Sequence, residues 1–267
     1  MMTVDQSNSW SSDRYSDGVF SHALSTERER LELLEASLDP YTFAALEPFA
    51  PGPGTRCLEV GGGAGSVARW MARTGADVTA VDLDTTFLEE LADEGVHVRR
   101  HDVVTQDFAP ESFDLIHARY VVIHLPDPAA AIERLCAWLA PGGVLVLEEP
   151  AFFPIAGSRH EAYRTAMLDF RAYLESAVGT LTEWARVLPE PLRAAGLTGV
   201  DISNRIQRIV GGGSEALWWR LTLEQTRPRM EEPSTDDETW NAALDALANP
   251  GFEDLSLAVF TATGRKP

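Results

Sequence analysis

The residues best suited to chemistry lie in a glycine-rich run between Cys57 and Ser66, which reads CLEVGGGAGS. An apolar stretch leads into the glycines and a helix-forming stretch follows them. Glycines let the backbone approach a ligand closely and adopt positive φ, and the start of the following helix presents unpaired N–H groups. Asp82 ends a second apolar run, at about the spacing at which an acid binds ribose hydroxyls. The pattern predicts a site for a nucleotide-type cofactor.

The glycines fit two cofactor signatures, of which the first is the dinucleotide fingerprint. Gly63, Gly65 and Ala68 satisfy Gly-x-Gly-x-x-Ala, and together with Asp82 they suggest an NAD(P)-dependent oxidoreductase. A Tyr-x-x-x-Lys pair is missing, however, because the only lysine is Lys266.

The second signature is Glu-x-Gly-x-Gly-x-Gly, formed by Glu59, Gly61, Gly63 and Gly65. It begins in register with the end of the predicted strand and places a carboxylate beside the loop. A carboxylate there suits a cationic or amino-bearing ligand and disfavours a pyrophosphate.

In this second register the chain resembles the class I S-adenosylmethionine-dependent methyltransferases, in particular the small-molecule branch that includes quinone-biosynthesis and bacterial natural-product enzymes. The resemblance covers Arg56 to about Pro150 and rests on four motifs in order. These are the glycine run, the apolar run ending at Asp82, His-Asp-Val at 101–103, and the segment FDLIHAR at 113–119 followed by HLPDP at 124–128.

The resemblance implies S-adenosyl-L-methionine as cofactor and assigns residues to its parts. The glutamate and glycines of the loop would hold the methionyl part, the acid after the second strand the ribose, and the aspartate of the third motif the adenine amino group. A tyrosine of the N-terminal helix would cover the cofactor. The residues carried over are Tyr15, Glu59, Gly61, Gly63, Gly65, Asp82, Leu83, Asp102, Val103 and Ala118.

Methyl transfer from a sulfonium is an in-line displacement, so alignment of the reactants matters most and a base is optional. His124 is the predicted catalytic base, because it lies just beyond the fourth strand at the ligand-binding end of the sheet. His160 is a second candidate, and one of Glu148 and Glu149 could face the acceptor. No metal site is expected.

The elements that must position these residues alternate between short apolar strands and amphipathic helices from Arg56 onward. This pattern predicts an α/β fold with a parallel sheet covered on both faces. With the resemblance, we expect a Rossmann-like, doubly wound, seven-stranded sheet with an antiparallel C-terminal strand. We expect three parts: an N-terminal helical lid (1–50), a cofactor-binding core (51–150), and a helical cap with the final strands (151–267). The lid helix after Thr26 should break at Asp39-Pro40.

Composition limits the partners. The 267 residues carry a formal net charge of -19, which disfavours nucleic acid and anionic membranes as partners. No signal peptide or membrane-spanning run is visible, and both cysteines lie in apolar surroundings, so we expect a cytoplasmic protein, a monomer or homodimer, that acts on a small molecule.

These observations predict a methyltransferase that acts on an O, N or C atom of a small metabolite, in bacterial natural-product biosynthesis. Two alternatives stay open at this point. One is a protein of the same fold that binds the cofactor without transferring a methyl group, and the other is the NAD(P)-dependent oxidoreductase.

Overall fold

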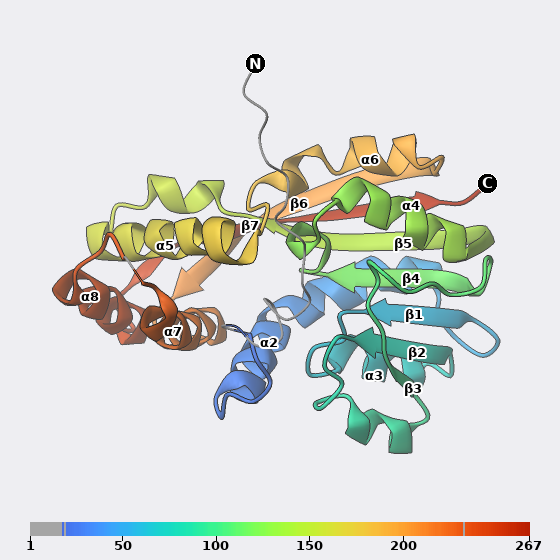
Figure 1. Cartoon of the computed structure of the whole chain (residues 1–267), viewed down its shortest axis with the longest axis horizontal. Helices are drawn as coiled ribbons and strands as arrows, with labels where there is room; N and C mark the ends of the chain where they lie inside the picture. The colour runs from blue at the N-terminus through green and yellow to red at the C-terminus, as the bar shows by residue number, and fades with distance from the viewer. Residues whose placement is uncertain (1–17, 19, 232) are drawn as a thin grey trace.

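The computed structural model describes residue 18, residues 20–231 and residues 233–267. Its centre is a seven-stranded sheet in the order β3-β2-β1-β4-β5-β7-β6 (Figure 1). The strands are β1 (Arg56–Val60), β2 (Asp77–Asp82), β3 (His97–Arg100), β4 (Phe113–Arg119), β5 (Leu139–Ala151), β6 (Thr198–Val210) and β7 (Glu253–Arg265). Strands β1 to β5 pair in parallel, whereas β7 runs antiparallel to both β5 and β6. The predicted α/β fold with an antiparallel C-terminal strand is therefore confirmed.

Helices cover both faces of the sheet and gather at one end of it. The longer ones are α2 (Glu27–Leu46), α3 (Ser66–Arg73), α4 (Pro128–Trp138), α5 (Glu161–Tyr173), α6 (Pro189–Ala194), α7 (Ser214–Thr226) and α8 (Asp237–Ala248). Short helical turns are η1 (Glu47–Phe49), η2 (Glu89–Glu94), η3 (Val122–His124), η4 (Phe153–Gly157), η5 (Leu174–Val178), η6 (Trp184–Val187) and η7 (Arg227–Arg229). Figure 1 shows α5, α7 and α8 grouped at one end of the sheet, with α2 between them and the parallel strands. We call α5, α7 and α8 the cap.

Strand β1 shows how the sheet is buried on both sides. Cys57 packs with α3 on one face, and Leu58 and Val60 join the α4 side on the other. Side chains of a strand alternate between faces, so a strand covered by helices on both sides must be apolar throughout. The polar residues Glu59 and His117 are exceptions, since both are buried on the α3 face.

The cap has its own apolar core, rich in aromatic side chains. Tyr163, Phe170, Trp219 and Trp240 are all almost fully buried within it. The rings of Phe152 and Phe170 each lie nearly perpendicular to Trp219, at centroid distances of 6.1 and 5.6 Å. Such tilted pairs are a favourable geometry for aromatic rings. The cap is thus a packed body and not a set of loose helices.

Helix α2 differs from the sequence prediction, because it continues through Pro40 without a break. A proline inside a helix removes one backbone hydrogen bond and costs about 3 kcal/mol. Tertiary contacts on either side of Pro40 offset this cost: Leu38 and Leu46 are fully buried, and Asp39 and Thr42 bond to the sheet. Thr26 precedes the helix without a side-chain capping bond, and its hydroxyl accepts Gln225 Nε2 at 2.9 Å instead.

Candidate active site

One cavity of about 300 Å³ lies at the carboxyl ends of the parallel strands, between α2 and the cap. Ligands of open α/β sheets bind at this edge, where the strand order changes direction, here between β1 and β4. The cavity has two ends of different character. One is formed by the glycine loop and strand ends, with Gly61, Gly63, Asp82, Leu83, Asp102 and Val103. The other is formed largely by aromatic side chains, including Phe20, His124, Phe152, Phe170, Trp218 and Trp219.

The glycine loop is held against the end of β2. Gly61 and Gly62 donate their N–H groups to the carbonyl oxygen of Val81 at 2.8 and 3.1 Å. Gly61, Gly63 and Gly65 all have positive φ, at 69°, 57° and 94°. A Cβ atom at Gly65 would meet Leu91 Cδ1 at 2.5 Å, whereas one at Gly63 would meet nothing nearer than 3.9 Å. Gly65 is therefore required for packing, whereas a Cβ atom at Gly63 would be only in van der Waals contact with Leu31 and Glu35.

Two acids lie at the glycine end of the cavity. Burial raises the pKa of Asp82, while the N–H of Gly63, which donates to its Oδ2 at 3.2 Å, acts in the opposite direction. Asp102 accepts hydrogen bonds from the N–H of Val104 and the hydroxyl of Thr105, at 2.9 and 2.8 Å. Asp82 is half-buried and bonded to the loop, and Asp102 holds its own turn in the cavity wall.

Three of the residues carried over lie behind the cavity wall rather than in it. Glu59 is 3% exposed and accepts a hydrogen bond from His117 Nδ1 at 2.7 Å. Gly65 starts α3, and Ala118 is fully buried in the core beneath the sheet. Tyr15 lies outside the described residues. The other six predicted cofactor residues and His124 line the cavity.

The Glu59 carboxylate belongs to a buried ionic cluster. His117 also approaches Glu148, with its Nε2 at 3.4 Å from Oε2. Burial opposes a charge on His117, but the two carboxylates outweigh this and raise its pKa to about 9. Burial likewise opposes the charge of Glu148, whose pKa nevertheless falls to about 2 through His117 and Arg119. Thr42 of α2 donates its hydroxyl to Glu148, which ties the lid helix to the cluster.

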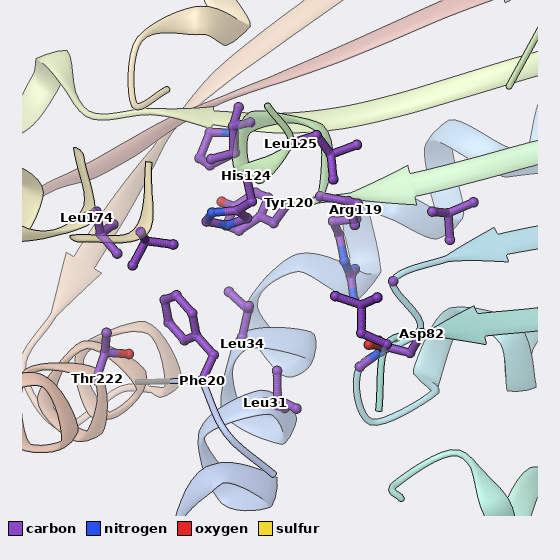
Figure 2. Close-up of a pocket in the computed structure, with 18 of the residues that line it drawn as sticks. Phe20, Leu31, Leu34, Asp82, Arg119, Tyr120, His124, Leu125, Leu174 and Thr222 are labelled. Atoms are coloured by element: carbon purple, nitrogen blue, oxygen red, sulfur yellow. The ribbon is translucent and has the colours of Figure 1, made fainter. Parts of the chain in front are cut away.

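Arg119, at the end of β4, connects this cluster to the cavity. Its Nη1 donates to Asp39 at 2.9 Å and to Thr42 at 2.8 Å, and its side chain is only 9% exposed. Figure 2 shows Arg119 pointing toward the side of the cavity where Asp82 lies. Arg119 was not among the residues predicted from the sequence, although its place at the end of a central strand is a signal that could have found it.

His124 lies at the opposite side, beside Tyr120 (Figure 2). Burial, assisted by the charge of Arg30, lowers the pKa of His124 to about 4, so the imidazole is neutral at pH 7. Its Nδ1 is 2.9 Å from Thr180 Oγ1. Tyr120 adopts φ 59°, an unusual value for a bulky residue, and donates its hydroxyl to Gln207 at 3.4 Å. The turn after β4 therefore brings two polar side chains into the aromatic end.

The remaining catalytic candidates are not part of the cavity wall. Glu149 is fully buried and accepts N–H groups of Val121 and Val122 at 3.2 and 2.7 Å, which fixes the turn that carries His124. Glu148 belongs to the ionic cluster. His160 packs on Phe252, with the ring centroids 4.7 Å apart. Within the described ranges, no cluster of three or more His, Cys, Asp or Glu side chains could hold a metal ion.

Comparison with known proteins agrees with this geometry. Residues 28–175 match the family model described as a methyltransferase domain. The chain is 32% identical, over 177 residues, to a ubiquinone biosynthesis O-methyltransferase of Xanthomonas axonopodis pv. citri, covering 57% of this chain and 72% of that protein. We conclude that the chain belongs to the methyltransferase-domain family and is a class I S-adenosylmethionine-dependent methyltransferase.

Solved structures share the fold. Phosphoethanolamine N-methyltransferase 2 of Haemonchus contortus, in complex with S-adenosyl-L-methionine, superposes with a TM-score of 0.62 at 19% identity, covering 97% of this chain and 61% of that one. An S-adenosylmethionine-dependent methyltransferase of Mesorhizobium loti gives a TM-score of 0.51 at 19% identity, covering 88% and 100%. Among the described residues, none of the helices is long and apolar enough to cross a membrane.

The cavity fits this cofactor. Gly63 and the half-buried acid Asp82, which both line the cavity, match a nucleoside that carries hydroxyl donors. The family identifies the cofactor as S-adenosylmethionine rather than a nicotinamide dinucleotide.

Proposed function

We propose that this protein transfers the methyl group of S-adenosylmethionine to an oxygen, nitrogen or carbon atom of a small, neutral, hydrophobic or aromatic metabolite. The observation that carries this proposal is that one continuous cavity joins the glycine loop and Asp82 to the aromatic chamber at the cap. By aromatic chamber we mean the end lined by Phe20, Phe152, Phe170, Trp218 and Trp219. Two ligands that share such a cavity can be held in line for displacement.

In the proposed arrangement the chain's own residues orient the nucleoside. Asp82 accepts hydrogen bonds from the ribose hydroxyls, and Leu83, Asp102 and Val103 form the wall against the adenine. When bound, the cofactor supplies an electrophilic methyl group on a sulfonium. The turn after β4, with Tyr120 and His124, then separates the nucleoside from the acceptor.

The chamber supports a neutral and largely apolar acceptor. Its walls are largely aromatic and aliphatic, and a buried ion pair that reaches it is satisfied internally. Arg30 donates from Nε and Nη2 to the Glu27 carboxylate, at 2.8 and 2.7 Å. Burying a charged acceptor against such walls without a partner would be costly. An aromatic ring would instead gain from contact with Trp218 and Trp219.

His124 is the proposed proton acceptor for a hydroxyl nucleophile. With a pKa of about 4 it is too weak to deprotonate a phenol before the reaction. As the acceptor oxygen bonds to carbon, however, its own proton becomes strongly acidic, so a neutral imidazole nearby suffices. Thr180 would hold the imidazole ring in place through Nδ1.

An oxygen nucleophile is the form that the relatives favour, since the curated relative named above is an O-methyltransferase. We also propose that the methylated product belongs to specialised bacterial metabolism, as the family resemblance implies.

The test is an acceptor panel. Purified protein is incubated with S-adenosylmethionine and one acceptor in each reaction. The acceptors are neutral phenols, aromatic amines, enolisable ketones and phosphate-bearing amines. The S-adenosylhomocysteine formed is quantified by mass spectrometry. Neutral aromatic acceptors should give turnover. His124→Gln should slow this turnover about tenfold, which is less than the usual contribution of a general base because His124 is a weak base. The matched control, His160→Gln, should leave the rate unchanged. Turnover confined to phosphate-bearing amines would contradict the proposal.

A further inference from the structure

The aromatic chamber contains an indole N–H that has no hydrogen-bond partner. Trp218 of α7 lines the cavity and is 5% exposed, and its Nε1 bonds to nothing among the described residues. The neighbouring Trp219, whose ring centroid is 4.3 Å away, differs because its Nε1 donates to Ser256 Oγ at 2.7 Å. A buried donor without a partner is costly, and folded proteins keep few of them. Trp218 therefore retains a donor that a bound ligand can satisfy.

Arg30 of α2 brings a second donor to the same cavity. Its Nε and Nη2 donate to the two carboxylate oxygens of Glu27, at 2.8 and 2.7 Å, and its guanidinium lies over the Phe20 ring, 4.9 Å from the centroid. These contacts hold one edge and one face of the guanidinium. Within the described ranges, Nη1 on the other edge has no hydrogen-bond partner, although the side chain is almost fully buried. Because a guanidinium has five N–H donors, Nη1 remains available to a ligand.

Helices α2 and α7 pack side by side in opposite directions. Just before α2, Thr26 accepts Gln225 Nε2 from the end of α7 at 2.9 Å. Further along α2, Ser37 lies beside Glu215 at the start of α7. Arg30, one turn into α2, is therefore level with the second half of α7.

The face of α7 at that level is the one that carries Trp218. Trp218 and Thr222 are four positions apart, so they lie one turn apart on the same face of the helix, and both line the cavity together with Arg30. The Thr222 hydroxyl is already used, since it donates to the backbone oxygen of Trp218 at 2.8 Å. Figure 2 shows Thr222 on the side of the cavity away from Asp82. The two open donors therefore belong to the acceptor side of the cavity.

The charge of Arg30 is already balanced, which selects the kind of oxygen that suits these donors. Glu27 is almost fully buried and neutralises the guanidinium. A carboxylate or phosphate brought to Nη1 would leave this buried group with a net negative charge, which is costly in a low-dielectric site. A carbonyl oxygen accepts hydrogen bonds through two lone pairs and adds no charge. The site therefore favours a neutral carbonyl group over an anion.

We infer that Trp218 Nε1 and Arg30 Nη1 determine the specificity of the aromatic chamber by donating hydrogen bonds to a carbonyl group of the acceptor, on the side away from the methylated atom. The acceptor class is then a neutral aromatic molecule that carries a ketone, ester or amide. This inference rests on the proposed function, and it deepens that function by naming the substrate class.

The test uses three phenols of the same length and nearly the same acidity. The compound 4-(4-hydroxyphenyl)butan-2-one carries a ketone, 4-butylphenol carries an alkyl chain, and 3-(4-hydroxyphenyl)propanoate carries a carboxylate. Each is titrated by isothermal calorimetry into protein saturated with S-adenosylhomocysteine, so that binding is measured without turnover. The ketone should bind at least about tenfold more tightly than 4-butylphenol, because the alkyl chain leaves the buried donors unpaired. The carboxylate should bind no more tightly than 4-butylphenol.

The variants remove one donor at a time. Trp218→Phe removes the indole N–H and keeps an aromatic ring, so it should weaken the ketone about fivefold and leave 4-butylphenol unchanged. Combining Glu27→Leu with Arg30→Met removes the ion pair as a unit and should also weaken only the ketone, by about fivefold or more. Trp240→Phe is the matched control, since Trp240 Nε1 is also buried without a partner but lies in the cap core and not in the cavity wall. It should change neither affinity.

Equal binding of the ketone and 4-butylphenol by wild type, tightest binding of the carboxylate, or a Trp240→Phe effect as large as that of Trp218→Phe would each overturn the inference. A preference for the ketone that survives in both Trp218→Phe and the double variant would do the same. Failure of the proposed function is a separate result, namely no S-adenosylhomocysteine formed from any acceptor of the panel, whereas these affinities are measured without methyl transfer.

Discussion

The stability of this protein should fall between pH 6.5 and about 9, and the largest contribution should come from one buried histidine. His117 lies between Glu59 and Glu148, and its pKa in the fold is about 9, against an ordinary value of 6.5. The folded state therefore holds this proton more tightly than the unfolded chain does. A raised histidine pKa contributes stability that is fully present below pH 6.5 and is lost as the pH rises through 9.

The size of the effect follows from the rise in pKa. Each pKa unit corresponds to about 1.36 kcal/mol, so a rise from 6.5 to about 9 is worth about 3 kcal/mol of unfolding free energy. Urea unfolding followed by circular dichroism at several pH values measures this directly. His117 alone should make the free energy decline by up to about 1.4 kcal/mol per pH unit in that window, and Glu149, whose pKa burial raises to about 8, should add to the decline below pH 8.

Two variants separate the contribution of His117 to the pH dependence of stability from that of other groups. His117→Gln should be less stable at pH 6.5 and should lose most of the decline between pH 8 and 9, where Glu149 no longer contributes. His97→Gln is the matched control, because His97 is 72% exposed and pairs with Asp77 at the surface. A wild-type free energy that is flat from pH 6.5 to 9.5, or a His117→Gln variant with an undiminished slope, would refute the charged state assigned to the cluster.

Three other predictions concern the glycine loop and the turn after β4. Gly65→Ala should lower the melting temperature by several degrees, because φ 94° and the contact with Leu91 together cost about 2 kcal/mol, which scanning fluorimetry measures. Gly63→Ala, at φ 57°, should cost about 1 kcal/mol of stability but weaken S-adenosylhomocysteine binding at least tenfold by calorimetry. A larger loss of stability in Gly63→Ala than in Gly65→Ala, with a smaller loss of binding, would contradict these roles. Glu149→Ala should lower the unfolding free energy by about 2 kcal/mol in urea, because it leaves buried N–H groups unpaired, and an unchanged midpoint would count against this.

The glycine loop and the alternating strands were predictable from sequence because their signals are local. Gly61, Gly63 and Asp82 are set by a strand that runs into a turn, and apolar runs alone define the parallel sheet. The confirmed antiparallel C-terminal strand needed the family resemblance, since a lone apolar strand does not reveal its direction. The continuous lid helix was missed because local proline chemistry was outweighed by tertiary bonds from Asp39 and Thr42.

The polar contacts of the site were harder to predict because they depend on pairing across the chain. Glu59 meets His117 only through the register of β1 against β4. Asp39 and Arg119 are 80 positions apart, so their ion pair depends on how α2 packs across the sheet. The left-handed backbone of Tyr120 has no sequence signal, since a tyrosine there gives no hint of positive φ.

The most direct test of the central claim is a crystal structure with S-adenosylhomocysteine bound. The account predicts the ribose hydroxyls within hydrogen-bonding distance of Asp82 and the adenine beside Leu83 and Asp102. The sulfur should face the turn that carries Tyr120 and His124, toward the aromatic chamber. A nucleoside bound outside this cavity, or a sulfur that faces away from the chamber, would contradict methyl transfer between its two ends.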